Sequence, residues 1–293
     1  FSKYERHNMQ ILDVMLSFMH EVKPFCENKK VSFRLTGSVG MGISERYNLP
    51  FVQEVVAATK TVQQDFPSIK TMIDIGGEDA KIVFFEKGEV SDFRMNGNCA
   101  GGTGAFIDQM AIILGVTVAD MNDLALRATQ IYPIASRCGV FCKTDIQNLI
   151  AKNVSRENIA ASIFHAVAVQ TVSTLAHGCD IKTPILFCGG PLTFLPALQK
   201  AFRDFLLLNA EDIVIPSYGE LFPSKGTALV EIENDSFQTL ESIIENVSSL
   251  SKRSRKTENI LPSLFETEEC YKQWQKRISQ HQLKKTSLLK GKQ

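Results

Sequence analysis

The residues of this chain that could do chemistry gather first at a turn between two apolar runs. The turn reads Asp74-Ile-Gly-Gly-Glu-Asp79, and it separates the run 69–75 from the run 82–85. This pattern predicts a strand, a tight turn and a second strand. Glycine lets backbone N–H groups approach an anion, and a carboxylate at the end of a buried strand can hold hydrated Mg²⁺ beside phosphate. We therefore predict a nucleotide phosphate site, with Asp74 as the catalytic residue and with Gly76, Gly77, Glu78 and Asp79 around the nucleotide.

A second glycine-rich turn contains a cysteine. It reads Cys99-Ala-Gly-Gly-Thr-Gly104 and leads into the segment 103–114, which is predicted to be helical. Each glycine costs about 0.5–1 kcal/mol relative to alanine in a regular element, so three in four residues indicate a close approach of a ligand or of another backbone. Unpaired N–H groups at a helix start favour an anion such as phosphate, a thiolate or a negatively charged cluster. The candidates are Gly102, Thr103 and Gly104 for a cofactor and Cys99 for a metal.

A third turn, Cys188-Gly-Gly-Pro191, follows the apolar run 184–188 and precedes a predicted helix. Either of the pairs Gly76-Gly77 and Gly189-Gly190, taken alone, could simply reverse the direction of the chain. Glycine pairs after two separate strands are what a nucleotide clamped between two lobes requires. We therefore predict that Gly189 and Gly190 contact the nucleotide from the side opposite Asp74.

The cysteines indicate half of a metal site. There are 7, an odd and scattered set, which argues against a disulfide framework. Cys138 and Cys142 have a C-x₃-C spacing, but two cysteines do not complete a tetrahedral zinc site, and the histidines show no ligand spacing with them. The more economical interpretation is that Cys99 and Cys138 supply half of a site and a second subunit or domain supplies the rest. Cys142 is expected to tolerate substitution.

The elements that position these residues are those of an α/β protein. Strands are predicted at 69–75, 80–86, 89–95 and 184–188, with a long helix from 155 to 178 and another from 193 to 208. Thr117-Val-Ala-Asp120 has the pattern of a capping box. Thr144-Asp-Ile-Gln147 has it too, so a helix is predicted at 145–152, after a loop 131–141 that carries Cys138. The last helix of this part is predicted to begin at Lys225.

Composition excludes some functions. The formal net charge is zero, and no apolar run reaches the roughly 18–20 residues of a membrane span, so we expect neither a nucleic-acid nor a membrane partner. Residues 235–250 are predicted as one polar helix. Residues 251–293 hold 11 Lys/Arg against 4 Glu and are predicted to be a solvated linker without an apolar face. The chain starts at Phe1 inside an apparent helix, so it is expected to be part of something longer.

These motifs, in this order, resemble the BadF/BadG/BcrA/BcrD-type ATPase family, which activates 2-hydroxyacyl-CoA dehydratases and benzoyl-CoA reductases. Asp74–Asp79 is similar to its phosphate loop, 98–104 and 137–141 to its two cluster-cysteine segments, and 187–191 to its adenosine-side glycine pair. Thr36-Gly-Ser-Val-Gly40 is similar to another turn of the family. The resemblance extends from about residue 30 to 231.

The resemblance implies the actin, sugar-kinase and heat-shock-ATPase fold, which is ribonuclease-H-like, here incomplete at its N-terminus. It implies three parts: the remainder of an N-terminal lobe (1–68), an ATPase lobe (69–233), and a polar helix with a basic tail (234–293). It also implies ATP or ADP with Mg²⁺, and a [4Fe-4S] cluster shared across a homodimer or a pair of sister modules through Cys99 and Cys138. ATP hydrolysis would then drive a low-potential electron into an acyl-CoA dehydratase or reductase in the cytoplasm.

Two departures leave alternatives open. The family's first phosphate loop, an Asp-x-Gly-Ser/Thr hairpin, is absent, and Glu78 stands where the family has an amide. The alternative is a non-catalytic, degenerate module that keeps the fold and acts as a pairing half in a larger protein. A sugar- or acetate-kinase-like enzyme is a third possibility, but it leaves Cys99 and Cys138 without a role. With half of the phosphate donors missing, residues 1–293 are predicted to bind ADP at roughly millimolar concentration.

Overall fold

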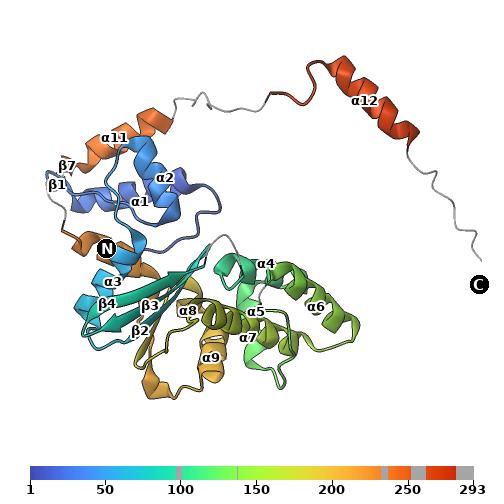
Figure 1. Cartoon of the computed structure of the whole chain (residues 1–293). Coiled ribbons are helices and arrows are strands. Elements are labelled where there is room, and N and C mark those ends of the chain that lie inside the picture. The colour runs from blue at the N-terminus through green and yellow to red at the C-terminus, as the bar shows by residue number, and fades with distance from the viewer. Residues whose placement is uncertain (97–100, 137, 232–236, 252–261, 282–293) are drawn as a thin grey trace, which may run out of the picture. The chain divides into compact units, whose positions relative to one another are not determined.

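In the computed structural model the chain forms two compact units, Phe1–Val247 and Ser248–Gln293. The structure describes residues 1–96, 101–136, 138–231, 237–251 and 262–281. The first unit is built on a five-stranded sheet in the order β4-β3-β2-β5-β6, shown in Figure 1. The strands are β2 Thr71–Ile75, β3 Ala80–Glu86, β4 Glu89–Met95, β5 Ile185–Cys188 and β6 Ile213–Val214. β2, β3 and β4 form an antiparallel meander, and β5 joins β2 in parallel, followed by β6. The predicted strands 80–86 and 89–95 are confirmed to the residue.

Both faces of the sheet are covered by helices, because successive side chains of a strand point to opposite faces. Ile73, Ile75, Ile82 and Phe84 pack into a core with the helices of one face. Those helices are α4 Gly104–Leu114, α5 Val118–Leu126, α6 Gly139–Ala151, α7 Arg156–Leu175, α8 Gly190–Phe194 and α9 Pro196–Leu206. Met72, Val83 and Phe85 form a smaller core with the opposite face, where α3 Glu54–Asp65 and α10 Phe222–Leu229 lie (Figure 1).

Further elements complete the first unit. They are α1 Ile11–Val22, β1 Lys30–Val31, α2 Gly37–Tyr47, β7 Gln238–Thr239, the part of α11 (Leu240–Ser251) up to Val247, and the 3₁₀ turns Lys23–Phe25, Ala210–Asp212 and Gly219–Leu221. β1 pairs with β7, and the Asn246 side chain of α11 donates to the carbonyl of Tyr47. α11 is not uniformly polar, as predicted for 235–250, because it buries Leu240, Ile243 and Val247.

Three helix boundaries differ from the predictions. α6 begins at Gly139, not at 145, and the Thr144 hydroxyl bonds the Val140 carbonyl inside the helix and does not cap it. The predicted helix 193–208 is two helices, α8 and α9, separated at Leu195 before Pro196. α10 begins at Phe222, three residues before the predicted start. The capping box at Thr117 and Asp120 is confirmed, with both reciprocal hydrogen bonds present.

The second unit contains the end of α11, from Ser248, and the helix α12 Glu268–Gln280, which lies within the tail that was predicted to be a solvated linker. Its Tyr271 and Trp274 rings lie 6.1 Å apart, and Phe265 lies 5.3 and 5.5 Å from them. The tail therefore has an aromatic cluster, and the prediction that it lacks an apolar face is wrong.

Candidate nucleotide cleft and cluster turn

The two predicted phosphate turns meet at the carboxyl ends of β2 and β5. The parallel register places Asp74 beside Cys188, so the glycines that follow each strand emerge at the same sheet edge. Gly189 has φ +82°, and a Cβ there would lie 2.1 Å from the Ile75 carbonyl oxygen and 2.4 Å from Asp74 Oδ1. Only glycine permits this approach, so glycine is required at position 189 for the two turns to come together.

A buried lysine lies directly beside Asp74. Asp74 and Lys81 are cross-strand partners on the face that carries α3, and their exposed fractions are 3% and 2%. The Lys81 ammonium contacts the carboxylates of Glu54, in the first turn of α3, at 2.9 Å and of Asp79 at 2.6 Å. Sequence reasoning missed Lys81 and Glu54. A lysine in the apolar strand Ala80–Phe85 was the available signal, because lysine is almost never buried without a partner.

Burial makes the Asp74 carboxylate unfavourable. Desolvation raises the pKa of Asp74 from 3.8 to about 6, against the opposing effect of Lys81, while Glu54 and Asp79 add to the rise. Desolvation alone would lower the pKa of Lys81, but Asp74, Glu54 and Asp79 together raise it above its ordinary value, so the lysine stays charged. Asp74 is therefore a carboxylate whose charged form gains from an additional cation.

A cavity of about 440 Å³ lies over these turns. Its lining includes seven of the predicted site residues: Asp74, Gly76, Gly77, Glu78, Gly104, Gly189 and Gly190. Asp79 instead pairs with Lys81, Thr103 caps α4, and Gly102, with φ +86°, packs on Thr171 of α7. Glu220 also lines the cavity, and its Oε2 atom is buried with no hydrogen-bond partner. An unpaired buried carboxylate oxygen fits a site that takes a cation.

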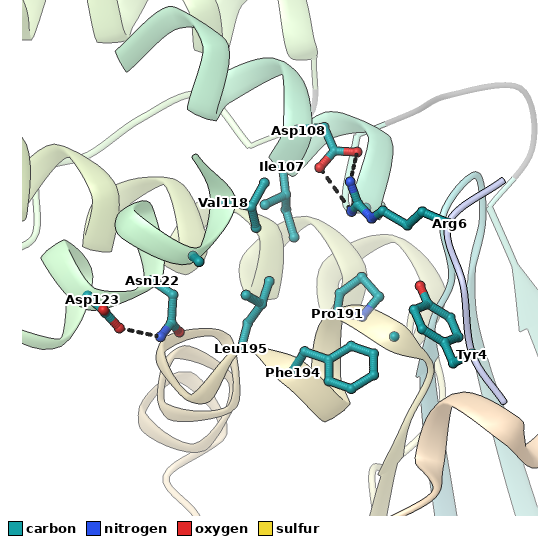
Figure 2. Close-up of a pocket in the computed structure, with 13 residues that line it drawn as sticks. Tyr4, Arg6, Ile107, Asp108, Val118, Asn122, Asp123, Pro191, Phe194 and Leu195 are labelled. Atoms are coloured by element: carbon teal, nitrogen blue, oxygen red, sulfur yellow. Dashed lines mark hydrogen bonds and ion pairs between the residues drawn. The ribbon is translucent and has the colours of Figure 1, made fainter. Parts of the chain in front are cut away.

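A second cavity of about 440 Å³ adjoins the first and is drawn in Figure 2. Ile107, Val118 and Leu195 supply apolar walls, and Asn122, Asp123 and Asp108 supply polar groups. The two cavities share six lining residues: Tyr4, Arg6, Gly104, Asp108, Gly190 and Pro191. The two cavities therefore adjoin each other along these six residues.

The first turn of α4 joins the phosphate turn to the cysteine turn. The N–H of Gly104 donates to the Gly76 carbonyl at 2.9 Å, and that of Ala105 donates to the Gly77 carbonyl at 2.7 Å. The Phe106 N–H bonds the Thr103 hydroxyl at 3.4 Å. These N–H groups are thus occupied by the protein itself, and the expectation that they remain unpaired for an anion is wrong. They couple the two turns mechanically instead.

Cys138 is the N-cap residue of α6, and its own side chain makes no capping hydrogen bond. A Cβ at Gly139 would lie 3.6 Å from the ring of Phe106, so the starts of α6 and α4 pack together. The chain approaching α6 is held by Asp145, which accepts from the Ala135 N–H at 2.8 Å. Cys138 is half-buried and free, and it lies closer to a helix start than predicted. Cys99 lies outside the described residues.

Cys142 does not share this setting. It is 1% exposed within the core, and burial first, then Asp145 and Cys138, raises the pKa of its thiol to about 12. A thiol of this kind does not supply the thiolate that a metal requires. In the part of the chain that the structure describes, no three His, Cys, Asp or Glu side chains converge on a metal site. Cys138 therefore needs ligands from elsewhere to hold a metal.

Comparison with known proteins agrees with this geometry. The model of the BadF/BadG/BcrA/BcrD ATPase family matches residues 26–229, which include Asp74 and the glycine turns that line the cavities. The chain belongs to this family. The (R)-2-hydroxyglutaryl-CoA dehydratase activating ATPase of Acidaminococcus fermentans is 37% identical over 125 residues, covering 43% of this chain and 48% of that protein. The 2-hydroxyisocaproyl-CoA dehydratase activator of Clostridioides difficile is 30% identical over 179 residues, covering 61% and 65%. The chain thus spans about half to two thirds of the length of these relatives.

Solved structures show the fold of this family member. The A. fermentans dehydratase component A superposes with a TM-score of 0.60 at 28% identity, covering 67% of this chain and 73% of that chain. The C. difficile activator with bound ADPNP superposes with a TM-score of 0.59 at 25% identity, covering 80% of each. The fold is the predicted one of the actin, sugar-kinase and heat-shock ATPases.

One described helix, α7, is long and apolar enough by composition to cross a membrane, and the bent pair α4–α5 passes the same test. α7 packs in the core through Ile159, Ile163 and Val167, which are fully buried. Its apolarity is explained by this packing.

Proposed function

We propose that this family member is an ATP-dependent activator module that binds Mg-ATP and Mg-ADP along the cleft. The phosphates would lie at Gly76-Gly77 and Gly189-Gly190, and the nucleoside would occupy the cavity of Figure 2. Two observations support this placement: the two cavities adjoin along six shared lining residues, and the solved C. difficile relative carries ADPNP.

Asp74 and Glu220 are the residues that would hold Mg²⁺. Asp74 has a raised pKa because it is buried, and Glu220 has a buried oxygen without a partner, so both carboxylates fit a cation. Mg²⁺ usually takes one or two protein carboxylates and completes its shell with water and phosphate. A site of two carboxylates is therefore sufficient. When bound, the ion neutralises phosphate charge, while the chain's own contribution is to fix Asp74 beside the turn.

Cys99 and Cys138 would supply two of the four thiolates of a [4Fe-4S] cluster, and a second copy or a sister module would supply the other two. The surface beside Cys138 supports pairing. Val140 and Phe141 are 72% and 66% exposed in the first turn of α6, where large apolar side chains favour an interface. Cys138 lies at the start of α6, and the positive end of the helix dipole there favours a negatively charged neighbour. A bound cluster would provide one-electron redox chemistry.

The observation that carries the proposal is the pair of hydrogen bonds from Gly104 and Ala105 to Gly76 and Gly77. They make the phosphate turn and the start of α4 one unit. A displacement of the turn by nucleotide is therefore passed to the helix that follows the cysteine segment. By likeness to its dehydratase-activating relatives, the module would serve a 2-hydroxyacyl-CoA dehydratase or benzoyl-CoA reductase in the cytoplasm.

The cluster is tested by an anaerobic ultraviolet–visible spectrum with iron and sulfide counts. We expect broad thiolate–iron absorbance in the parent protein and its loss in Cys99→Ser and Cys138→Ser. Cys142→Ser is the matched control, because it lies four residues away and is buried in the core. Unchanged iron in both ligand variants would refute the cluster assignment. Iron lost equally in Cys142→Ser would make the C-x₃-C pair the ligand set.

The second candidate is a non-catalytic module that keeps the fold and pairs within a larger protein. Glu78 favours it, since this carboxylate lines the phosphate cavity and would repel the γ-phosphate. Steady-state turnover distinguishes the two candidates. A Glu78→Gln variant that gains ATP hydrolysis over an inactive parent would support the degenerate module, whereas turnover by the parent that Asp74→Ala removes would support the activator.

A further inference from the structure

The N-terminal segment crosses the cleft at the junction of its two cavities. Residues 1–8 precede the part of the chain that matches the family, so they are not part of the shared motif set. The Tyr4 ring lies 5.2 Å from that of Phe194, and its hydroxyl lies close to Gly190. Figure 2 shows Arg6 reaching from this segment to Asp108 of α4, with two hydrogen bonds of 3.2 and 3.3 Å.

Arg6 lies at the border between the two cavities. It lines both of them, together with Asp108 and Gly104. A ligand whose sugar lies in one cavity and whose phosphates lie in the other therefore brings its α- and β-phosphates to the guanidinium.

The charges of the phosphate cavity make this cation important. Six carboxylates line the cavity: Glu5, Glu54, Asp74, Glu78, Asp108 and Glu220. Of the described residues along its wall, Arg6 alone carries a permanent positive charge. Lys81 lies beneath the cavity and is already held by Glu54 and Asp79. Arg6 is therefore the side chain along this wall that can offer a positive charge to a polyanionic ligand.

The Arg6–Asp108 contact can be exchanged. Its side chains are 62% and 39% exposed, and an ion pair so open to solvent contributes little to stability. A guanidinium matches two phosphate oxygens as well as it matches a carboxylate, and phosphate carries more charge. An incoming nucleoside di- or triphosphate therefore competes effectively for the guanidinium.

We propose that Arg6 binds the phosphates of the nucleotide and that Asp108 is its resting partner, displaced when nucleotide enters. Asp108 thereby weakens nucleotide binding by holding Arg6, and Arg6 strengthens it. This inference rests on the proposed nucleotide site and adds to it a phosphate-binding residue from outside the family motifs.

Titration of the full chain with Mg-ADP and with adenosine, by calorimetry suited to weak binding, tests the proposal. Arg6→Gln should weaken Mg-ADP binding about tenfold and leave adenosine binding unchanged, since adenosine has no phosphate. Asp108→Asn should tighten Mg-ADP binding severalfold, because the carboxylate that competes for Arg6 is gone. The double variant should bind like Arg6→Gln alone. A gain of affinity in Asp108→Asn cannot arise from misfolding.

Lys3→Gln is the matched control. It removes a positive charge from the same segment, but Lys3 pairs with Glu21 and lines a different cavity. Its Mg-ADP affinity should equal that of the parent. Parent binding of Mg-ADP with no change in Arg6→Gln or Asp108→Asn would overturn the role of Arg6 and leave the nucleotide site standing. A parent that binds neither ligand would overturn both proposals.

Discussion

Replacing Asp74 by asparagine should stabilise the nucleotide-free protein at neutral and alkaline pH. The Asp74 carboxyl is 3% exposed, and its pKa in the folded protein is about 6, above its ordinary 3.8. A raised pKa means that the folded state binds this proton more tightly than the unfolded state. The stability that it contributes is fully present below about pH 4 and is lost as the pH rises through about 6.

The difference between the two pKa values sets the magnitude. At about 1.4 kcal/mol per pKa unit, ionising Asp74 in the folded protein costs about 3 kcal/mol. Asparagine has the same shape and no charge, so Asp74→Asn avoids this cost above about pH 7. Lys81 keeps Glu54 and Asp79 as partners at 2.9 and 2.6 Å, so the substitution leaves no isolated buried charge. The expected gain corresponds to about 6–12 °C in melting temperature.

Urea unfolding followed by far-ultraviolet circular dichroism, at about pH 8 and about pH 4, measures this effect. Asp74→Asn should unfold at higher urea than the parent at the higher pH and at equal urea at the lower pH. Asp65→Asn is the control of opposite sign: Lys225 and Tyr218 lower the pKa of Asp65, so its loss should destabilise the protein at both of these pH values, and the deficit should fade only as the pH falls below about 4 through the lowered pKa.

Two results would refute the reasoning about Asp74. A variant that is less stable than the parent at the higher pH would show that Lys81 stabilises the Asp74 anion more than burial disfavours it. A gain that persists undiminished at the lower pH would show that packing, not ionisation, is responsible. Added Mg-ADP should stabilise the parent and not the variant, since ligand binding to the folded state raises stability only where the site is intact.

Two further predictions concern packing and thiol reactivity. Gly226→Ala should destabilise the protein by about 3 kcal/mol or more in urea unfolding, because a Cβ there would lie 1.6 Å from the Ala57 carbonyl oxygen of α3. Gly42→Ala is the control, since a Cβ at that position would have nothing within 4 Å. Equal stability of the two variants would contradict the packing of α10 on α3. Cys142 should resist iodoacetamide in the native protein at about pH 8, because burial raises the pKa of its thiol to about 12, whereas the exposed Cys270 should be alkylated. Mass spectrometry of the peptides measures both reactions, and rapid labelling of Cys142 would place it at the surface.

Local signals were sufficient for the turns. The phosphate turn, the strands around it and the capping box at Thr117 were predictable because each depends on residues within a few positions of one another. The family resemblance likewise rested on short motifs, and the match over residues 26–229 confirms it. The start of α6 was predicted wrongly because it depends on residues far apart in the sequence. The local pattern at Thr144 resembles a capping box as closely as the one at Thr117 does, but α6 begins at Gly139, where the chain packs on Phe106 of α4.

The sequence by itself determined which residues could bind an anion, and the tertiary structure decided which charges surround them. Lys81 is 27 residues from Glu54, and Arg6 is 102 residues from Asp108, so no periodicity or spacing relates the members of either pair. Side chains alternate between the two faces of the sheet along β2 and β3, and this alternation places Asp74 and Lys81 on the face that carries α3. The first turn of that helix supplies Glu54. A side chain's burial and its charged neighbours set its pKa, and both exist only after the chain has folded.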